Sequence, residues 1–214
     1  MKKSKLAAAI ALLSCYPGAA FSDTVFEEIS VVAQKREQSV QEVGIAITAL
    51  TGDQLEALGF DNAQQVTAMA PGVQTVQPNG EANYSVGIRG VTNSDFTTNV
   101  ESPVALYVDE VYISQMSGAG FSLFDLERVE ILRGPQGTLF GRNATGGLVH
   151  FITRKPTFYQ EGYAKITLGD YNQRKFEGAY SNELTESLAA RLSVNINKAD
   201  GYIDNRYTGD KLNN

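Results

Sequence analysis

Strict alternation of apolar and other side chains is the feature that most restricts how this chain can fold. It is clearest at residues 188–197 (LAARLSVNIN) and recurs at residues 162–169 and 174–181, with connectors expected at residues 170–172 and 182–186. A period of two residues predicts strands whose two faces meet different surroundings. Antiparallel strands of about 10 residues with one apolar face are typical of a transmembrane β-barrel. The edge of a soluble β-sandwich is the alternative.

The first 22 residues have the pattern of an export signal. Three lysines precede an apolar stretch, and small residues surround a cleavage point expected before Asp23. A lipoprotein cleavage box ending at Cys15 is the alternative, although Leu13 fits such a box poorly. Both interpretations predict an exported protein. Cleavage before Asp23 would remove Cys15, the only cysteine of the sequence, so no disulfide is expected.

Charge and run length exclude several other classes of protein. The 214 residues include 24 acidic and 18 basic side chains, a net charge of -6, so we expect no binding to nucleic acid. The longest apolar run, residues 6–13, falls far short of the roughly 18 residues of a membrane-spanning helix. The glycine-rich segment at residues 134–138 (GPQGT) lacks the lysine and the spacing of a phosphate-binding loop.

The polar residues do not assemble a recognisable catalytic or metal site. His150 is the only histidine, and a metal site normally needs a second strong ligand nearby. No spacing of serine, histidine and carboxylate residues selects a catalytic group. We therefore expect a structural His150, no metal, no cofactor and no enzymatic activity. A carboxylate cluster around His150 would instead indicate a secreted enzyme.

Residues 39–156 predict an α+β domain with a small mixed sheet and short helices. Helices are expected at residues 54–58 and 63–70, beginning near Thr51 and Asp61. Short strands are expected at residues 44–50, 73–76, 84–91, 104–113, 128–134 and 147–153. Because strands and helices do not alternate regularly, a parallel α/β fold is not expected.

Residues 23–38 form a polar and charged segment around a short apolar patch at residues 29–32. Such a segment cannot bury enough apolar surface to fold alone. We therefore expect a flexible tail whose patch can pair with a partner as an added strand. An edge strand of the following domain is an equally good interpretation.

Three motifs resemble the plug domain of TonB-dependent outer-membrane receptors: IRG at residues 88–90, VALYVDEVY at residues 104–112, and VEILRGPQGTLFGRNATGG at residues 129–147. The last motif is long and specific, and the resemblance extends from Phe26 to about Thr157. It implies active uptake of a scarce ligand across the bacterial outer membrane, most commonly a ferric siderophore and sometimes haem, cobalamin or a sugar. Energy would come from TonB with ExbB and ExbD.

The resemblance also implies a set of functional residues. It places the TonB box, the periplasmic segment that pairs with TonB, at Glu28, Ile29, Ser30, Val31 and Val32. It implies that Arg89 and Arg133 pair with glutamates of the barrel wall in a charge lock that also includes Glu130, so the two arginines should lie close together and near Glu130 or Glu127. Exposed turn arginines that face solvent are the alternative. Ligand contacts are expected at the tips of the plug, residues 78–84 and 93–99, from Tyr84, Asn93 and Phe96, and solvated loops without ligand contacts are an equally good interpretation.

Length is where the sequence departs from the family. A plugged transporter barrel has about 22 strands, whereas residues 157–214 supply about three. We therefore expect an incomplete barrel and the N-terminal part of a receptor, which would not transport alone because open strand edges are costly in lipid. A free-standing periplasmic ligand-binding or interaction module, or an inactive receptor remnant, is the alternative.

Overall fold

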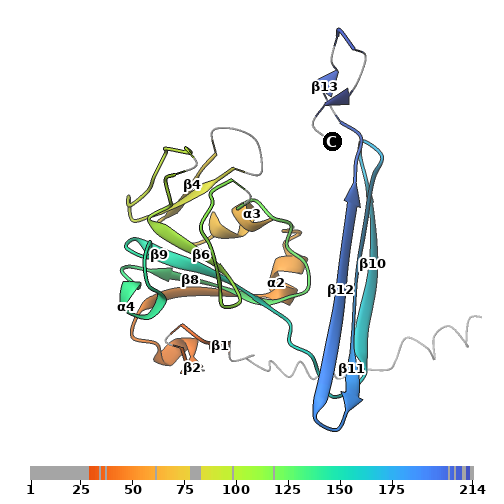
Figure 1. Ribbon diagram of the computed structural model, residues 1–214, viewed down its shortest axis with the longest axis horizontal. Helices are drawn as coiled ribbons and strands as arrows, with labels where there is room; N and C mark the ends of the chain where they lie inside the picture. Colours follow the sequence, from red (N-terminus) through yellow and green to blue (C-terminus); the bar gives the residue numbers. More distant parts are fainter. Residues whose placement is uncertain are drawn as a thin grey trace, which may run out of the picture.

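The computed structural model describes most of residues 29–212. The positions left out within that range are 34, 37, 61, 78–82, 98, 118, 202, 205, 209 and 210. The expected signal segment, Cys15 and Glu28 lie outside the described residues. Figure 1 shows an α+β domain beside a long, upright sheet of antiparallel strands.

A five-stranded mixed sheet forms the centre of the domain. Its strand order is β3 (Ala46–Thr51), β8 (Leu126–Arg133), β9 (Gly147–Thr153), β6 (Val104–Val108) and β7 (Val111–Ile113). Strands β6 and β9 run parallel, and the other neighbours are antiparallel. This arrangement confirms the expected α+β class with a mixed sheet.

Alternate residues of the central strands point into two separate apolar cores. Val129 and Phe151 face the upper core. This core is closed by α2 (Gly52–Ala57), α3 (Ala63–Thr67) and the antiparallel pair β4 (Val73–Val76) and β5 (Ser85–Ile88). Leu132 and Leu148 face the lower core, on the other side of the sheet. The second core is closed by β1 (Ser30–Val31), β2 (Gln38–Ser39), the 3-10 helix η1 (Val40–Glu42) and α4 (Gly137–Phe140). The domain thus has three layers, with the sheet in the middle.

The short helices begin where side chains cap their free backbone N–H groups. Thr51 starts α2 with a reciprocal capping box, in which its hydroxyl accepts from the Gln54 N–H at 3.2 Å. Helix α3 starts at Asn62, whose side chain accepts from the Gln65 N–H at 3.0 Å. The expected start at Asp61 was therefore wrong by one residue. Asn and Asp cap equally well, so the sequence did not separate them.

The second sheet contains β10 (Glu161–Gly169), β11 (Gln173–Thr185) and β12 (Leu188–Lys198), paired in that order and antiparallel. The three alternating segments of the sequence form these strands. The connector expected at residues 182–186 was wrong, because β11 continues to Thr185 through an irregularity in its pairing with β12. A short pair, β13 (Ile203–Asp204) and β14 (Lys211–Leu212), follows.

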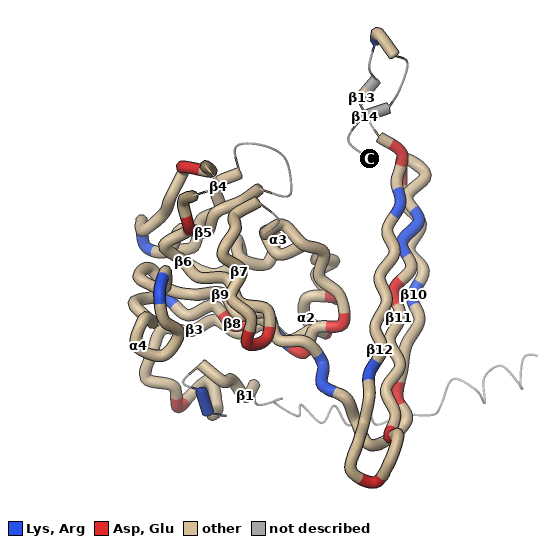
Figure 2. Tube along the Cα trace, viewed as in Figure 1, with Lys and Arg blue, Asp and Glu red and all other residues tan. Residues whose placement is uncertain are grey.

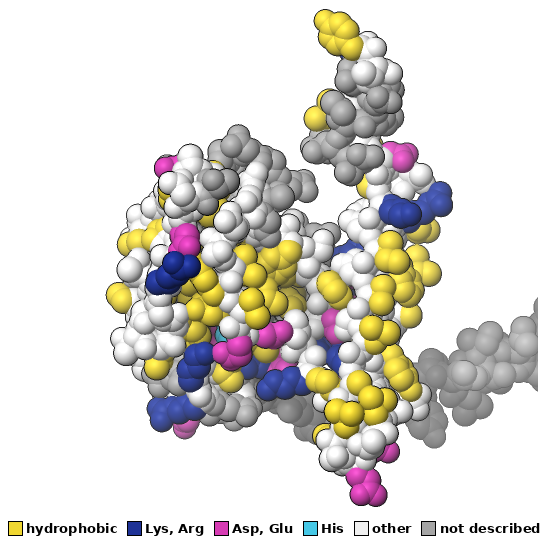
Figure 3. Space-filling model, viewed as in Figure 1, with side chains coloured by type: hydrophobic (Ala, Val, Ile, Leu, Met, Phe, Trp, Pro, Cys, Tyr) yellow, Lys and Arg dark blue, Asp and Glu magenta, His cyan; other side chains and the backbone are white. Residues whose placement is uncertain are grey.

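The two faces of this sheet differ as the alternation predicted. Ile166, Leu168 and Leu192 lie on the apolar face and are 73%, 75% and 70% exposed. Lys175 and Ser181, on the other face, are buried. Figure 3 shows apolar side chains gathered along the strand sheet.

No helix among the described residues has the length and apolar character needed to cross a bilayer.

The long strands also define two ends of the molecule. In Figure 1, β1 and β2 lie at the lower end, the same end as the tight turn between β11 and β12. The β4–β5 pair lies at the upper end, toward β13. The described part of the segment expected to meet TonB therefore lies at the opposite end of the domain from the β4–β5 pair.

Candidate functional site

The described part of the expected TonB box is folded into the domain. Ser30 and Val31 pair with Ser39 and Gln38, and Val31 is fully buried. Val31 packs in the lower core with Phe140. The edge-strand interpretation therefore describes the position of this segment, and residues 29–33 are held in the structure by apolar contacts.

A buried carboxylate holds the backbone of the same segment. Glu130 on β8 is fully buried, and its Oε1 accepts from the Val32 N–H at 2.9 Å and from Arg128 Nε at 2.8 Å. Arg128 also pairs with Glu127. Glu130 was therefore wrongly grouped with Arg133, because residues three apart on a strand point to opposite faces. Its contacts are with the N-terminal segment.

Arg89 and Arg133 meet at one turn. Arg133 Nη1 donates to the Pro71 carbonyl at 3.1 Å, and the Arg89 N–H donates to the Gly72 carbonyl at 2.9 Å. The exposed Arg89 side chain passes beside Gly134, the residue after Arg133. Arg133 Nε is buried with no hydrogen-bond partner among the described residues.

The tips of the domain differ from what the sequence predicted. Tyr84 is fully buried in the upper core, and this burial raises the pKa of its phenol. Its assignment as a ligand contact was therefore wrong. The Tyr84 ring, just before β5, packs into the domain instead of projecting from its tip. The Asn93 side chain stabilises its own loop, accepting from the Asp95 N–H at 3.0 Å and donating to the Glu101 carbonyl at 3.4 Å. Phe96 is half-buried. Residues 78–82 lie outside the described residues.

His150 is a buried side chain of the lower core region. Its Nε2 contacts the Asp109 carbonyl, and it lies opposite Glu130 in the β8–β9 pairing. Burial lowers the pKa of the imidazole, while the Asp109 carbonyl and the nearby carboxylates oppose that shift. Among the described residues, no group of three or more His, Cys, Asp or Glu side chains could hold a metal ion.

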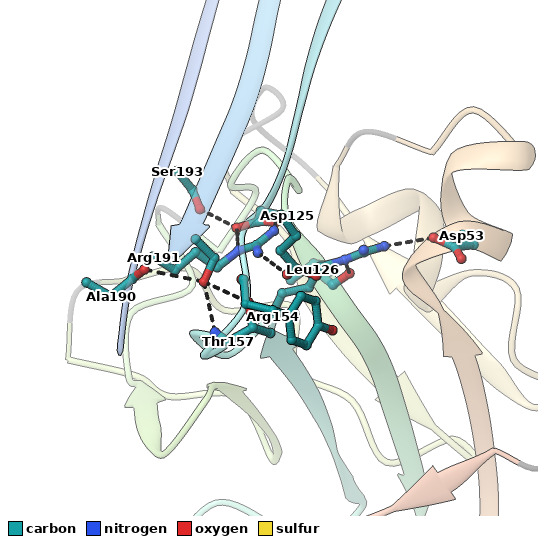
Figure 4. Close-up of polar contacts among 11 residues, drawn as sticks. Asp53, Asp125, Leu126, Arg154, Thr157, Ala190, Arg191 and Ser193 are labelled. Atoms are coloured by element: carbon teal, nitrogen blue, oxygen red, sulfur yellow. Dashed lines mark hydrogen bonds and ion pairs between the residues drawn. The ribbon is translucent and has the colours of Figure 1, made fainter. Parts of the chain in front are cut away.

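A contact that the sequence analysis missed joins the domain to the strand sheet. Asp125, just before β8, accepts from Arg191 Nη2 at 2.5 Å, from Arg191 Nε at 2.7 Å and from the Ser193 hydroxyl. Figure 4 shows these side chains from β12 converging on the Asp125 carboxylate. A sequence signal existed, since Arg191 is the one charged residue in the alternating segment at residues 188–197. Nothing in the sequence, however, indicated its partner.

Further polar contacts lie beside and across this interface. Within the plug, Arg154, after β9, donates to Asp53 at 2.7 Å and to the Leu126 carbonyl at 3.2 Å. Across the interface, Lys165 of β10 pairs with Glu56 of α2 at 2.7 Å. Figure 2 shows basic and acidic residues on both sides of this interface. Between α2 and strands β10 and β11 lies a cavity of about 450 Å³.

This fold has a clear match among known families. Residues 39–148, just over half of the chain, match the family described as TonB-dependent Receptor Plug Domain. The chain belongs to this family. The plug resemblance drawn from the sequence motifs is therefore confirmed, and so is the expected plug fold followed by antiparallel strands.

Relatives of this plug domain are uptake proteins. The vitamin B12 transporter BtuB of Photobacterium profundum is 27% identical over 208 residues, covering 94% of this chain and 33% of the transporter. The ferrioxamine B receptor of Salmonella typhimurium is 28% identical over 162 residues, covering 72% of this chain and 22% of the receptor. These proteins are receptors and transporters, which confirms at the family level that the plug-bearing chain is not an enzyme.

A solved structure shows the same arrangement of plug and strands. The ferric yersiniabactin uptake receptor FyuA from Yersinia pestis superposes with a TM-score of 0.70 and 25% identity, covering 78% of this chain and 26% of FyuA. The plug-bearing chain thus spans a third or less of the length of the relatives that it matches.

Proposed function

We propose that this chain is the plug-bearing part of a receptor for TonB-dependent uptake of a ferric siderophore across the bacterial outer membrane. The observation that carries the proposal is the family match over residues 39–148, in a plug packed beside strands whose outward face is apolar. The ferrioxamine and yersiniabactin receptors among its relatives support a ferric siderophore. Cobalamin is the second candidate, because the BtuB relative matches the largest share of the chain reported above.

The proposed division of the chain follows from the same reasoning. Residues 1–22 are the export signal, 23–38 the tail with the TonB box, 39–156 the plug, and 157–214 the first barrel strands. Short turns of outer-membrane barrels face the periplasm. The tight turn between β11 and β12 lies at the same end as β1, which supports a periplasmic position for the TonB box. The apolar face of β10–β12 would then contact outer-membrane lipid.

Uptake by the complete reading frame that contains this chain tests the function. The frame is expressed in a host without its own ferrioxamine and cobalamin receptors, with TonB present or deleted. We expect radiolabelled ferrioxamine B to accumulate only in cells with TonB. Accumulation of radiolabelled cobalamin instead would overturn the siderophore assignment. Uptake of neither probe would favour an inactive remnant, and a monomeric residue 23–214 fragment that dissolves without detergent would favour a periplasmic module.

Pairing of the TonB box with TonB would use main-chain hydrogen bonds, so backbone changes should matter more than side-chain swaps. Proline at Ile29 or Val31 removes a donor and fixes φ. We expect I29P or V31P to reduce uptake roughly tenfold or more and I29V or V31I to leave it near wild type. Unchanged uptake with either proline variant would show that the box at residues 28–32 is misplaced.

The proposed charge lock between plug and barrel rests on the two arginines alone. Arg89 and Arg133 lie at one turn, and the unsatisfied Nε of Arg133 supports a carboxylate partner outside the described residues. Of the two, only Arg133 is partly buried, and a buried charge without a partner is strongly destabilising. R133K in the complete receptor should therefore weaken the seating of the plug more than R36K, a basic residue of the proposed tail, when resistance to protease is compared.

A further inference from the structure

The plug touches the strand sheet through two ion pairs of very different burial. In the pair formed by Asp125 and Arg191, both side chains are 5% exposed. In the pair formed by Glu56 and Lys165, the side chains are 61% and 43% exposed. The cavity of about 450 Å³ lies between α2 and the strands, and Glu56, Asp125 and Lys165 are among the residues that line it. The interface is therefore held by a buried ion pair on the side of Asp125 and by an exposed ion pair on the side of α2.

Asp125 is held rigidly on the plug side of the firm contact. Its backbone has a left-handed conformation, with φ of 53°, and its carbonyl accepts from the Arg154 N–H at 3.0 Å. Leu123 and Leu126 on either side are buried in the upper core. An Asp can adopt this conformation, but it persists only where surrounding contacts enforce it. Here it directs the carboxylate toward β12.

The strand side of the firm contact is equally fixed. Arg191 uses Nε and Nη2 for Asp125 and Nη1 for Glu161 of β10, at 2.7 Å. Two-pronged pairing between a guanidinium and a carboxylate is strong and directional. Breaking it would leave two buried charges without compensation, which is strongly unfavourable. The Glu56–Lys165 pair is exposed, and such surface pairs contribute little to stability.

We propose that Asp125, Arg191 and Ser193 form a fixed anchor that stays closed during uptake, while the interface opens on the side of α2. This proposal rests on the uptake function proposed above and adds the residues that keep the plug attached to the strand sheet when TonB acts on its N-terminal segment. The pair of Glu56 and Lys165 separates in each cycle, and the cavity beside α2 widens.

Asn in place of Asp125 tests the anchor in the complete receptor. D125N keeps the shape of the side chain but removes the charge and one of the two accepting oxygens, so the two-pronged contact with Arg191 is lost. We expect a plug that assembles normally and detaches when TonB acts, so cells should become roughly tenfold more sensitive to vancomycin, which is too large to cross an intact outer membrane, only when TonB is present. D53N is the matched control, because the Asp53–Arg154 pair lies within the plug.

The outcomes separate an anchor from a merely structural role. Equal vancomycin sensitivity with and without TonB, or sensitivity unchanged by D125N, would overturn the proposal. Uptake of ferrioxamine B and cobalamin by the wild-type receptor is measured first. Absence of both contradicts the proposed function, whereas wild-type uptake combined with either overturning result contradicts only the anchor.

Reversible cross-linking gives a second measurement, in which a covalent link takes the place of the anchor contact. The paired cysteine variants D125C/S193C and E56C/K165C are treated with a bifunctional thiol reagent that reductant cleaves. We expect uptake within roughly twofold of the untreated variant when positions 125 and 193 are joined. Joining positions 56 and 165 should reduce uptake roughly tenfold, with recovery on reduction. Reversible loss of uptake on joining 125 and 193 would overturn the anchor.

Discussion

At the scale of single residues, Gly147 has little freedom to change. It begins β9 with φ of 148°, and a Cβ at this position would lie 2.2 Å from the Leu132 carbonyl oxygen. G147A should therefore destabilise the plug by roughly 1–3 kcal/mol or more, since an L residue is strained there and β8 must also shift. Denaturant unfolding measures the loss. The control is G44A, because Gly44 has open space around its Cβ position; equal effects of the two variants would contradict this reading.

His150 makes the stability of the plug depend on pH. Burial lowers its pKa in the folded state below the usual value of about 6.5. The charged groups that face it are Asp109, Glu110 and Glu130. As pH falls below about 6.5, the unfolded chain binds a proton that the folded plug resists, so stability falls, by at most about 1.4 kcal/mol per pH unit for one proton.

The measurement is the unfolding midpoint between about pH 7 and pH 5 for the wild type and for H150Q. The wild type should lose stability over this interval more steeply than H150Q, which has no imidazole to protonate. Carboxylates titrate mainly at lower pH and contribute equally to both proteins. Parallel pH curves for the two proteins would show that His150 does not couple to folding.

At the scale of elements, β1 is held by Glu130 and by the burial of Val31. E130Q removes the negative charge that compensates Arg128 and weakens the bond to the Val32 N–H. We expect β1 to separate from the lower core more often, because loss of a buried partner costs several kcal/mol. Trypsin should then cleave after Lys35 or Arg36 roughly tenfold faster. E127Q, which changes a more exposed partner of the same arginine, should leave the cleavage rate near wild type.

The sequence predicted elements better than it predicted contacts. Periodicity and turn residues located β9 and the three long strands, because those patterns are local. It missed α4, since four residues of the glycine-rich block (GTLF) carry no helical periodicity. Tyr84 and Glu130 were misassigned for a different reason: which face of a strand is buried, and against what, depends on segments distant in the sequence. The Asp125–Arg191 pair spans 66 residues and has no local signal.

At the scale of the whole molecule, two contacts near the lower end differ in how firmly they are held. β1 is attached by its pairing with β2, a few apolar side chains and one carboxylate, and it is not part of the central sheet. The anchor joins Asp125 to β12 and is buried. A pulling force applied at β1 would therefore release the weakly held N-terminal segment before it broke the anchor. A plug that moves during uptake but stays attached to the strand sheet requires this order.

The outward face of β10–β12 gives the last prediction. Leu192 is 70% exposed, and in the proposed receptor this exposure is to lipid. L192K should reduce insertion into the outer membrane, since a lysine on the lipid face costs about 2–4 kcal/mol at the bilayer midplane. N195K is the matched control, because Asn195 lies on the opposite face and pairs across the strands with Glu177. Heat-modifiable migration of the complete receptor on gels measures assembly. If L192K and N195K assembled equally well, the apolar face would not be in contact with lipid.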